Sequence, residues 1–197
     1  MTRSPHVVTL PADRVWWRVA DASWTDPLDA GFADERGGRW NSPGDGATLY
    51  LNADIDTARA QIPRLLLGTP IDPEDLRDDA PFVLVPARLP SRQRVADAAS
   101  DTGLTALGLP RTYPRRARGG EVPWSLCRSA ARAVRAAGLR GVLARSAATS
   151  DGSGRELAWF PARGARARPA GAILPFAQWR HATLRSSVSP TDVGRPR

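Results

Sequence analysis

Cysteine and histidine are scarce in this sequence, and both shortages limit the chemistry that the chain can carry out. The lone thiol, Cys127, can form neither an internal disulfide nor a cysteine-rich zinc site. The two histidines, His6 and His181, lie near the chain ends, which argues against a histidine-based metal site or catalytic triad. We therefore expect no metal ion.

Long hydrophobic runs are also missing. No stretch of 18 consecutive apolar residues is present, so no membrane-spanning helix is predicted. The first residues lack the apolar stretch and small-residue cleavage site of a signal peptide. From these two absences we expect a cytoplasmic protein that makes no contact with a membrane.

Lysine is absent altogether, so all 28 basic residues are arginines, and the net charge is +8. Guanidinium groups bind phosphates through paired hydrogen bonds. The charge alone suits a nucleic acid, an acidic protein partner or a pyrophosphate ligand, and it does not choose among them.

The 197 residues suffice for one well-packed domain, which we place in residues 1–165. Residues 166–197 are predicted to form a basic linker, one short element between 173 and 184, and a disordered tail. Strands are predicted where short apolar stretches are bounded by Gly, Pro or Asp. These stretches are residues 47–51, 82–88, 141–145 and 156–160.

Two helices are predicted from apolar residues at helical spacing. The first begins near residue 56, with Asp54 or Asp56 as its N-cap, and Pro63 is expected to kink or end it. The second has Ser125 as its cap and ends at Gly138. Its apolar stripe should bury Cys127, and its arginines are expected to form a solvated outer face; these are Arg128, Arg132 and Arg135. Strands and helices alternate irregularly, which favours the α+β class.

Several polar residues stand in apolar or glycine-rich surroundings. Arg18 interrupts the strand-like stretch Trp17–Val19, where a buried arginine requires an anionic partner. The segment GGRWN at residues 37–41 combines glycines, which allow a ligand close to the backbone, with the donors Arg39 and Asn41. Tyr50 lies on a predicted strand eleven residues before Gln61, and Ser146 follows the strand at 141–145.

In order and spacing these residues resemble the RES-domain family. The matching stretches are WWRVADASWTDPLDAGFADERGGRWNSPG, ATLYLNADIDTARAQ, GLRGVLARSA and GRELAWFP, which together span roughly residues 14 to 161. The resemblance implies a fold similar to ADP-ribosyltransferases, with small mixed or antiparallel sheets flanked by helices and a central NAD cleft. It also implies a toxin of a toxin–antitoxin pair that degrades NAD by hydrolysis or phosphorolysis, or transfers ADP-ribose to a protein.

Carried over residue by residue, the resemblance assigns the phosphates of NAD to Arg18 and Arg39. Tyr50 would pack against the nicotinamide, Asn41 would add a donor, and Ser146 would orient the neighbouring ribose. NAD is then the ligand, and a cognate DNA-binding antitoxin is the expected protein partner. The resemblance implies no direct contact with nucleic acid, and it leaves a homo-oligomer open.

The family's glutamate falls at Gln61, which is an amide in this chain. Breaking the nicotinamide–ribose bond develops positive charge on the ribose, and a carboxylate would stabilise it. Glutamine brings no charge, which leaves three alternatives. Glu121 or Glu156 supplies the charge, a slower reaction suffices, or the protein binds NAD or an ADP-ribose ligand without turnover. Whether the chain is an enzyme thus stays open. An arginine-rich nucleic-acid binder is the third alternative, although no nucleic-acid module is visible.

Overall fold

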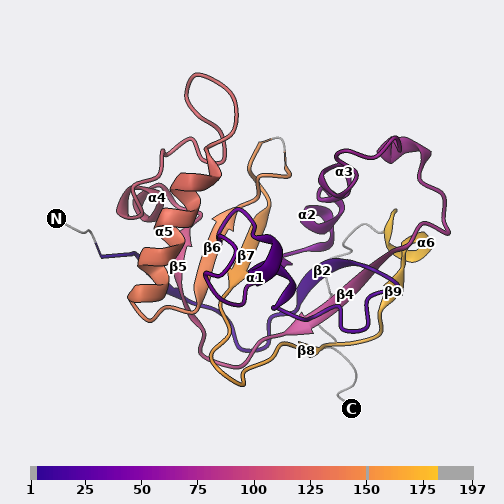
Figure 1. The fold of residues 1–197 in the computed structure, drawn as a ribbon, viewed down its shortest axis with the longest axis horizontal. Helices are drawn as coiled ribbons and strands as arrows, with labels where there is room; N and C mark the ends of the chain where they lie inside the picture. Colours follow the sequence, from indigo (N-terminus) through magenta and orange to yellow (C-terminus); the bar gives the residue numbers. More distant parts are fainter. Residues whose placement is uncertain (1–3, 150, 182–197) are drawn as a thin grey trace, which may run out of the picture.

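The fold is organised around one mixed β-sheet, seen in the computed structural model, which describes residues 4–149 and 151–181 (Figure 1). Within these residues nine strands follow the order β1-β5-β6-β7-β3-β2-β4-β8, and β9 pairs with β4. β5 and β6 are parallel, and the other pairs are antiparallel. The strands are β1 (Val7–Thr9), β2 (Trp16–Asp21), β3 (Leu49–Asn52), β4 (Phe82–Arg88), β5 (Arg94–Ala98), β6 (Gly141–Arg145), β7 (Arg155–Trp159), β8 (Arg168–Pro169) and β9 (Leu174–Pro175).

Helices cover one face of this sheet in two groups (Figure 1). The helices are α1 (Phe32–Arg36), α2 (Ile55–Arg59), α3 (Ile62–Leu65), α4 (Asp101–Ala106), α5 (Trp124–Ala136) and α6 (Phe176–Trp179), with a short 3-10 turn, η1 (Pro73–Asp75). The connection from β5 to β6 runs through α4 and α5, because parallel strands require a crossover. The α+β class is therefore confirmed.

The sheet consists of two parts that are joined at a single residue pair. β2 contacts β3 only where Trp17 pairs with Asn52, whereas β2 pairs with β4 along its whole length. Beyond that pair β2 and β3 diverge, and in Figure 1 β6 and β7 stand steeply while β2 and β4 lie across them. Instead of the separate small sheets expected from the sequence, one sheet is split along the boundary between β2 and β3.

Three apolar clusters hold the layers together. The first packs α4 and α5 on β5, β6 and β7, and it includes Trp40 and the fully buried thiol of Cys127. Leu49, Leu51 and Leu157 belong to the second cluster, on the opposite face of the same strands, since successive residues of a strand point to opposite faces. The third lies under α2, α3 and α6 against β2 and β4. Between the two helical groups, part of the sheet face is left for polar side chains.

The predicted helices exist, with different boundaries. Asp54 caps α2 by accepting a hydrogen bond from the Thr57 amide at 2.7 Å. The chain then breaks at Gln61, and Pro63 lies in the first turn of α3, where its missing N–H costs nothing. Ser125 is not the cap of the second helix, because α5 begins at Trp124 and is preceded by Pro123.

Strand predictions agree closely for β4 and β6, while β3 and β7 are displaced by one or two residues. Residues 166–179 do not form a separate linker, since β8 and β9 pair with β4. Phe176 and Trp179 of α6 are buried in the third cluster. The predicted tail, beyond residue 181, lies outside the described residues. Among the helices that are described, none is long and apolar enough to cross a membrane.

Candidate functional site

The segment GGRWN forms a tight turn after α1. Gly37 ends the helix with φ at +75°, a conformation that side chains with a Cβ rarely adopt. A Cβ on Gly38 would overlap the Tyr50 hydroxyl, so only glycine lets the turn lie on that ring. The backbone of Gly38 pairs with Asn41, and Trp40 between them is buried in the first cluster. The glycines therefore let the turn pack on Tyr50 of β3, whereas from the sequence we expect a ligand to approach this backbone.

Tyr50 is the centre of a hydrogen-bonded group. Its hydroxyl donates to Asn41 Oδ1 at 2.7 Å and accepts from the Trp40 amide at 2.8 Å. Asn41 is fully buried and donates in turn to the Ala33 carbonyl. Burial, and next to it the negative charge of Glu156, raises the pKa of the Tyr50 phenol, so Tyr50 remains a neutral donor at physiological pH.

Arginines of α5 fasten this turn to the helix. Arg128 Nε donates to the Gly38 carbonyl at 2.9 Å, and Arg132 donates to Ser42 Oγ at 3.2 Å. Arg135 reaches Thr48 Oγ1 at 2.6 Å and lies over the ring of Phe160. The predicted solvated face is confirmed for Arg132, which is exposed, whereas Arg128 and Arg135 are half-buried against the segment between residues 38 and 48.

Arg39 is buried, with 7% of its surface exposed, and it shares a carboxylate with a second arginine. Its guanidinium donates to Glu121 Oε2 at 2.6 Å, and Arg64 of α3 binds the other oxygen of Glu121. Arg64 also donates to the Ala147 carbonyl at 2.6 Å. Burial alone would raise the pKa of Glu121, but the two arginines lower it, so its charge is neutralised by both.

Gln61, at the break between α2 and α3, donates from Nε2 to Asn52 Oδ1 at 3.1 Å. Asn52 Nδ2 donates to the Trp17 carbonyl at 3.1 Å. Asn52 thus ties three parts together: β3, β2 and the helix break. The amide of Gln61 is held where β2 and β3 begin to diverge.

Ser146 follows β6 and is fully buried. Its hydroxyl bonds to Oε1 of Glu156 on β7, and the same oxygen accepts the Ala147 amide at 2.8 Å. Glu156 pairs across the strands with Asn52, so both side chains lie on the face that carries Tyr50. Ser146 and Gln61 are therefore brought to neighbouring positions through Glu156 and Asn52.

Arg18 is the one predicted site residue that makes no contact with this group. It follows the Trp17–Asn52 pair directly, and the strand alternation turns its side chain to the other face of β2. Its guanidinium is 3.4 Å from the Asp29 carbonyl and 5.5 Å from the ring of Trp24. Burial, opposed by Asp29 and Asp26, lowers its pKa to about 10, and no carboxylate among the described residues lies within ion-pair distance of it.

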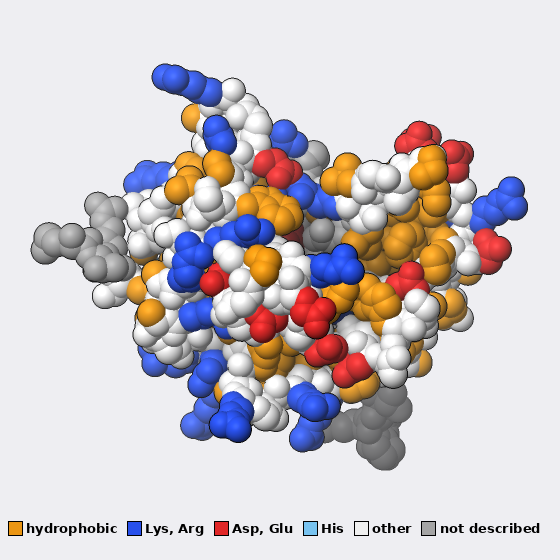
Figure 2. All heavy atoms as spheres, in the orientation of Figure 1, with side chains coloured by type: hydrophobic (Ala, Val, Ile, Leu, Met, Phe, Trp, Pro, Cys, Tyr) orange, Lys and Arg blue, Asp and Glu red, His pale blue; other side chains and the backbone are white. Residues whose placement is uncertain are grey.

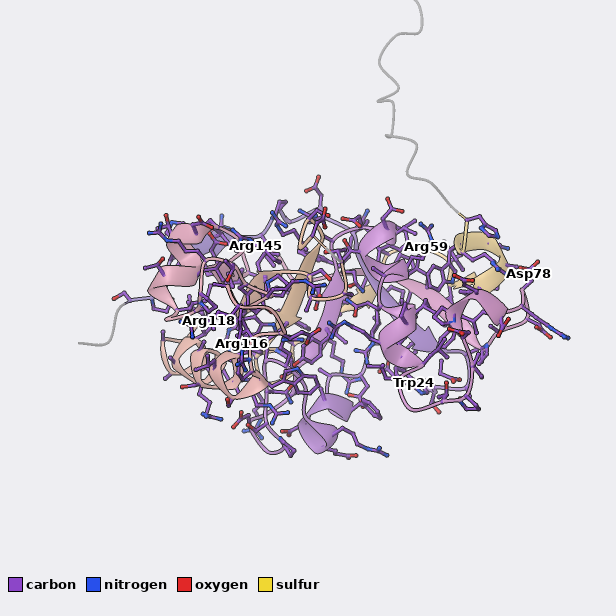
Figure 3. The ribbon with its side chains drawn as sticks, turned by 90° about the horizontal axis from the view of Figure 1, so that it is seen from above. Trp24, Arg59, Asp78, Arg116, Arg118 and Arg145 are labelled. Atoms are coloured by element: carbon purple, nitrogen blue, oxygen red, sulfur yellow. The ribbon has the colours of Figure 1, made fainter. Side chains whose placement is uncertain are left out.

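Two groups of elements border the site, and we call them lobes: α4 and α5 with β5, β6 and β7, and α2, α3 and α6 with β2 and β4. In Figure 3, Arg145 and Arg116 mark the lobe of α4 and α5. Arg59 and Trp24 mark the side of α2 and β2. Between the lobes, the structure brings together a phenol, amides, a hydroxyl, two guanidinium groups and two carboxylates. Such a set can bind an anion and a sugar hydroxyl and place negative charge beside a reacting carbon.

Sequence reasoning missed Asn52 and Arg64. Asn52 lies two residues after Tyr50, which on a strand means the same face, and Arg64 lies three residues after Gln61, which on a helix means the same side. Both spacings were visible in the sequence. Their contacts, however, depend on how the helix break sits against β3, and that arrangement is tertiary.

Comparisons with known proteins identify the family and the fold of this chain. The RES domain family model matches residues 15–179. A chain of the crystal structure of the M. tuberculosis MbcT–MbcA toxin–antitoxin complex superposes with a TM-score of 0.65 at 20% sequence identity. The match covers 86% of this chain and 90% of that one, and at this identity it establishes a shared fold. The search of curated proteins gave no match.

Proposed function

The chain belongs to the RES domain family, and from that premise we propose that it binds NAD between its two lobes and cleaves the nicotinamide–ribose bond as the toxin of a toxin–antitoxin pair. The observation that carries the proposal is the convergence of Tyr50, Gln61 and Ser146 where β2 and β3 diverge. An ADP-ribosyltransferase-like cleft, as the family resemblance implies, would occupy this split.

The residues present fit a dinucleotide. Two phosphates require cationic donors, and Arg39 and Arg64 already share a carboxylate in the site. A guanidinium has five N–H donors, so each arginine retains donors for a phosphate beside its bond to Glu121. Arg18 lies on the other face of β2, and in the described part of the chain no carboxylate is within ion-pair distance of it. In this proposal an anionic part of the ligand reaches Arg18 along the split between β2 and β3.

On the nicotinamide side, each residue has a separate role. The Tyr50 ring offers an aromatic face, and its orientation is fixed by Asn41 and Trp40. Gln61 can hydrogen-bond a ribose hydroxyl while it is held by Asn52. Ser146 is oriented by Glu156 and can act on the same ribose. When bound, NAD supplies the glycosidic bond and a leaving group that departs neutral.

A second function differs only in turnover. Because Gln61 replaces the family's glutamate, the same residues would bind NAD or an ADP-ribose ligand without cleaving it. NAD would then stabilise the fold against heat and remain intact, since a ligand that binds only the native state raises its stability.

Incubation of the purified chain with NAD separates the two functions. We expect free nicotinamide to appear, with ADP-ribose as co-product in hydrolysis, or its phosphorylated form when inorganic phosphate is required. Gln61→Glu should raise the rate, because it adds negative charge beside the ribosyl cation. Chromatography of the products gives both results. Intact NAD together with a NAD-dependent rise in melting temperature would instead favour the binding module.

The expected protein partner is an antitoxin. The structurally similar MbcT–MbcA assembly is a toxin–antitoxin complex, and we extend that pairing to this chain as part of the proposal. Co-purification with the product of an adjacent gene, followed by loss of NAD cleavage in the complex, tests it.

A further inference from the structure

We propose that the carboxylate needed for cleavage has moved in this protein from position 61 to Glu156 on the neighbouring strand. The inference rests on the proposed function, because it concerns how the same site performs the reaction. It starts from Gln61, whose amide lies at the predicted catalytic position but carries no charge.

Glu156 lies on β7, directly across from Asn52 of β3, which accepts the hydrogen bond of Gln61. Asn52 accepts the Gln61 hydrogen bond, and Asn52 and Glu156 are cross-strand partners of β3 and β7. The Cβ atoms of such a pair are about 4.5–5.5 Å apart and point to the same face. Only the side chain of Asn52 therefore separates position 61 from Glu156, and a negative charge on Glu156 lies close to the predicted catalytic position.

The contacts of Glu156 leave its charge available. Its Oε1 accepts hydrogen bonds from Ser146 Oγ and from the Ala147 amide, which orient the carboxylate without neutralising it. Among the described residues no arginine lies within ion-pair distance of Glu156. The effect of this charge reaches the site, since it contributes, after burial, to the raised pKa values of the phenols of Tyr50 and Tyr113.

Glu121, the other carboxylate nearby, does not meet the same requirement. Both of its oxygens are bound by guanidinium groups, from Arg39 and Arg64. Two cations around one carboxylate leave a net positive charge, which would oppose a developing ribosyl cation. Arg39, Arg64 and Glu121 together suit the phosphates, whereas Glu156 suits the sugar.

In the proposed reaction Glu156 stabilises the ribosyl cation and then acts as the base. The bond between ribose C1′ and the nicotinamide nitrogen breaks, and its electron pair neutralises the pyridinium ring. The ribose carbon becomes positive, and the Glu156 carboxylate stabilises it. A water oxygen then bonds to C1′, and Glu156 accepts the proton that this water releases and returns it to solvent. When phosphate replaces water, its oxygen forms the new bond and no proton needs to be removed.

Four chains test the inference: the natural sequence, Glu156→Gln, Gln61→Glu and the double variant. We expect Glu156→Gln to lower NAD cleavage by about 10²–10⁴-fold. Adding Gln61→Glu to that variant should restore most of the lost rate, because it returns a carboxylate to the same space. If Glu156 only supports the Ser146 loop, a new charge at position 61 cannot replace that support and the rate stays low.

Controls separate chemistry from folding. Glu74→Gln, on the exposed turn η1, removes the same charge far from the site and should leave the rate unchanged. Glu156→Asp keeps the charge and should retain part of the activity even if Glu156→Gln unfolds, and melting curves with NAD verify that each variant folds and binds. Cleavage by Glu156→Gln at the natural rate, or a double variant no faster than Glu156→Gln, overturns the inference alone. No cleavage by the natural chain overturns the proposed reaction as well.

Discussion

At the scale of single residues, the partly buried arginines differ in what compensates their charge. Arg39 is ion-paired with Glu121, and Arg135 is held by oxygens of residues 46–48 and by the Phe160 ring. Arg18 has one long hydrogen bond to a carbonyl and a ring beside it. The charges of Asp29 and Asp26 offset only part of the desolvation of Arg18 and form no ion pair with it, so an anionic ligand at Arg18 would be stabilised.

On the proposed function, replacing Arg18 with alanine should abolish the expected NAD-dependent rise in melting temperature. A ligand present at 100 times its Kd stabilises the native state by about 2.7 kcal/mol, which is a readily measured shift. Arg14→Ala is the matched control, since Arg14 lies just before β2 and packs over the ring of Trp16. A NAD-dependent shift of normal size in Arg18→Ala would show that Arg18 does not bind the ligand.

Some contacts of single residues could be predicted from the sequence, and others could not. The approach of Gly38 to Tyr50 was accessible, because a glycine pair before a polar donor has few explanations other than close packing. The contact of Arg64 with Glu121 was not accessible, because it joins residues 57 positions apart through side chains whose direction depends on the fold.

At the scale of elements, helix boundaries were predicted most accurately where a single side chain determines the backbone conformation. Asp54 caps α2, and Pro63 accompanies the break before α3, as expected from their chemistry. The outer face of α5 was predicted correctly only for the exposed Arg132. Helical spacing shows which residues face away from the core, but it does not show that Arg128 and Arg135 extend to residues 38–48.

The junction of β5 and α4 depends on one buried carboxylate. Asp97 accepts hydrogen bonds from the Ala99 and Ser100 amides, from the Ser100 hydroxyl and from His6. Burial alone would raise the pKa of Asp97, but these hydrogen bonds lower it below its ordinary value. The folded state therefore prefers the ionised form more strongly than the unfolded chain does.

Asp97→Asn should reduce the free energy of unfolding at pH 7 by about 1–3 kcal/mol, because the charged acceptor is lost. A lowered carboxyl pKa contributes its full stability above the unfolded value of about 4 and loses it as the pH falls through the folded value. The difference between parent and variant should accordingly shrink between pH 5 and pH 3. Urea titrations at each pH measure it, with the exposed Asp13→Asn as control. A difference that does not depend on pH would contradict the role of the charge.

At the scale of the whole molecule, the C-terminal segment completes the core of the α2–α3 lobe. Phe176 and Trp179 pack edge to face, and the backbone oxygen of Trp179 accepts a hydrogen bond from Arg59 of α2 at 3.0 Å. Figure 2 shows hydrophobic side chains gathered on this half of the molecule, while arginines are spread over the other half and the lower edge. The boundary predicted at residue 165 does not coincide with any break in packing.

Trp179→Ala should lower the free energy of unfolding by about 3–5 kcal/mol, because the ring has no exposed surface and its removal leaves a cavity. Ile173→Ala, in the same segment but 48% exposed, should cost far less. Thermal and denaturant unfolding of both variants gives the comparison. A loss for Trp179→Ala no larger than the small loss expected for Ile173→Ala would mean that the ring contributes little to the core.

Sequence reasoning placed this segment outside the domain for a physical reason. Strands of two residues, such as β8 and β9, are too short to show a periodic pattern, and their Pro, Gly and Arg neighbours are typical of linkers. The α+β class and the clustering of Tyr50 with GGRWN were predictable, because they depend on local composition and spacing. The split between β2 and β3 was not, since it depends on which strands pair.

That split gives the chain a region where length is free to change. Residues 22–29, which follow β2, take part in no strand pairing, and β3 meets β2 again only at the far end. Additions or deletions there would leave every register of the sheet intact, because no ladder has to slide to accommodate them. A loop grafted there would change the surroundings of Arg18, where Trp24 and Asp29 now lie, without altering the strand pairing.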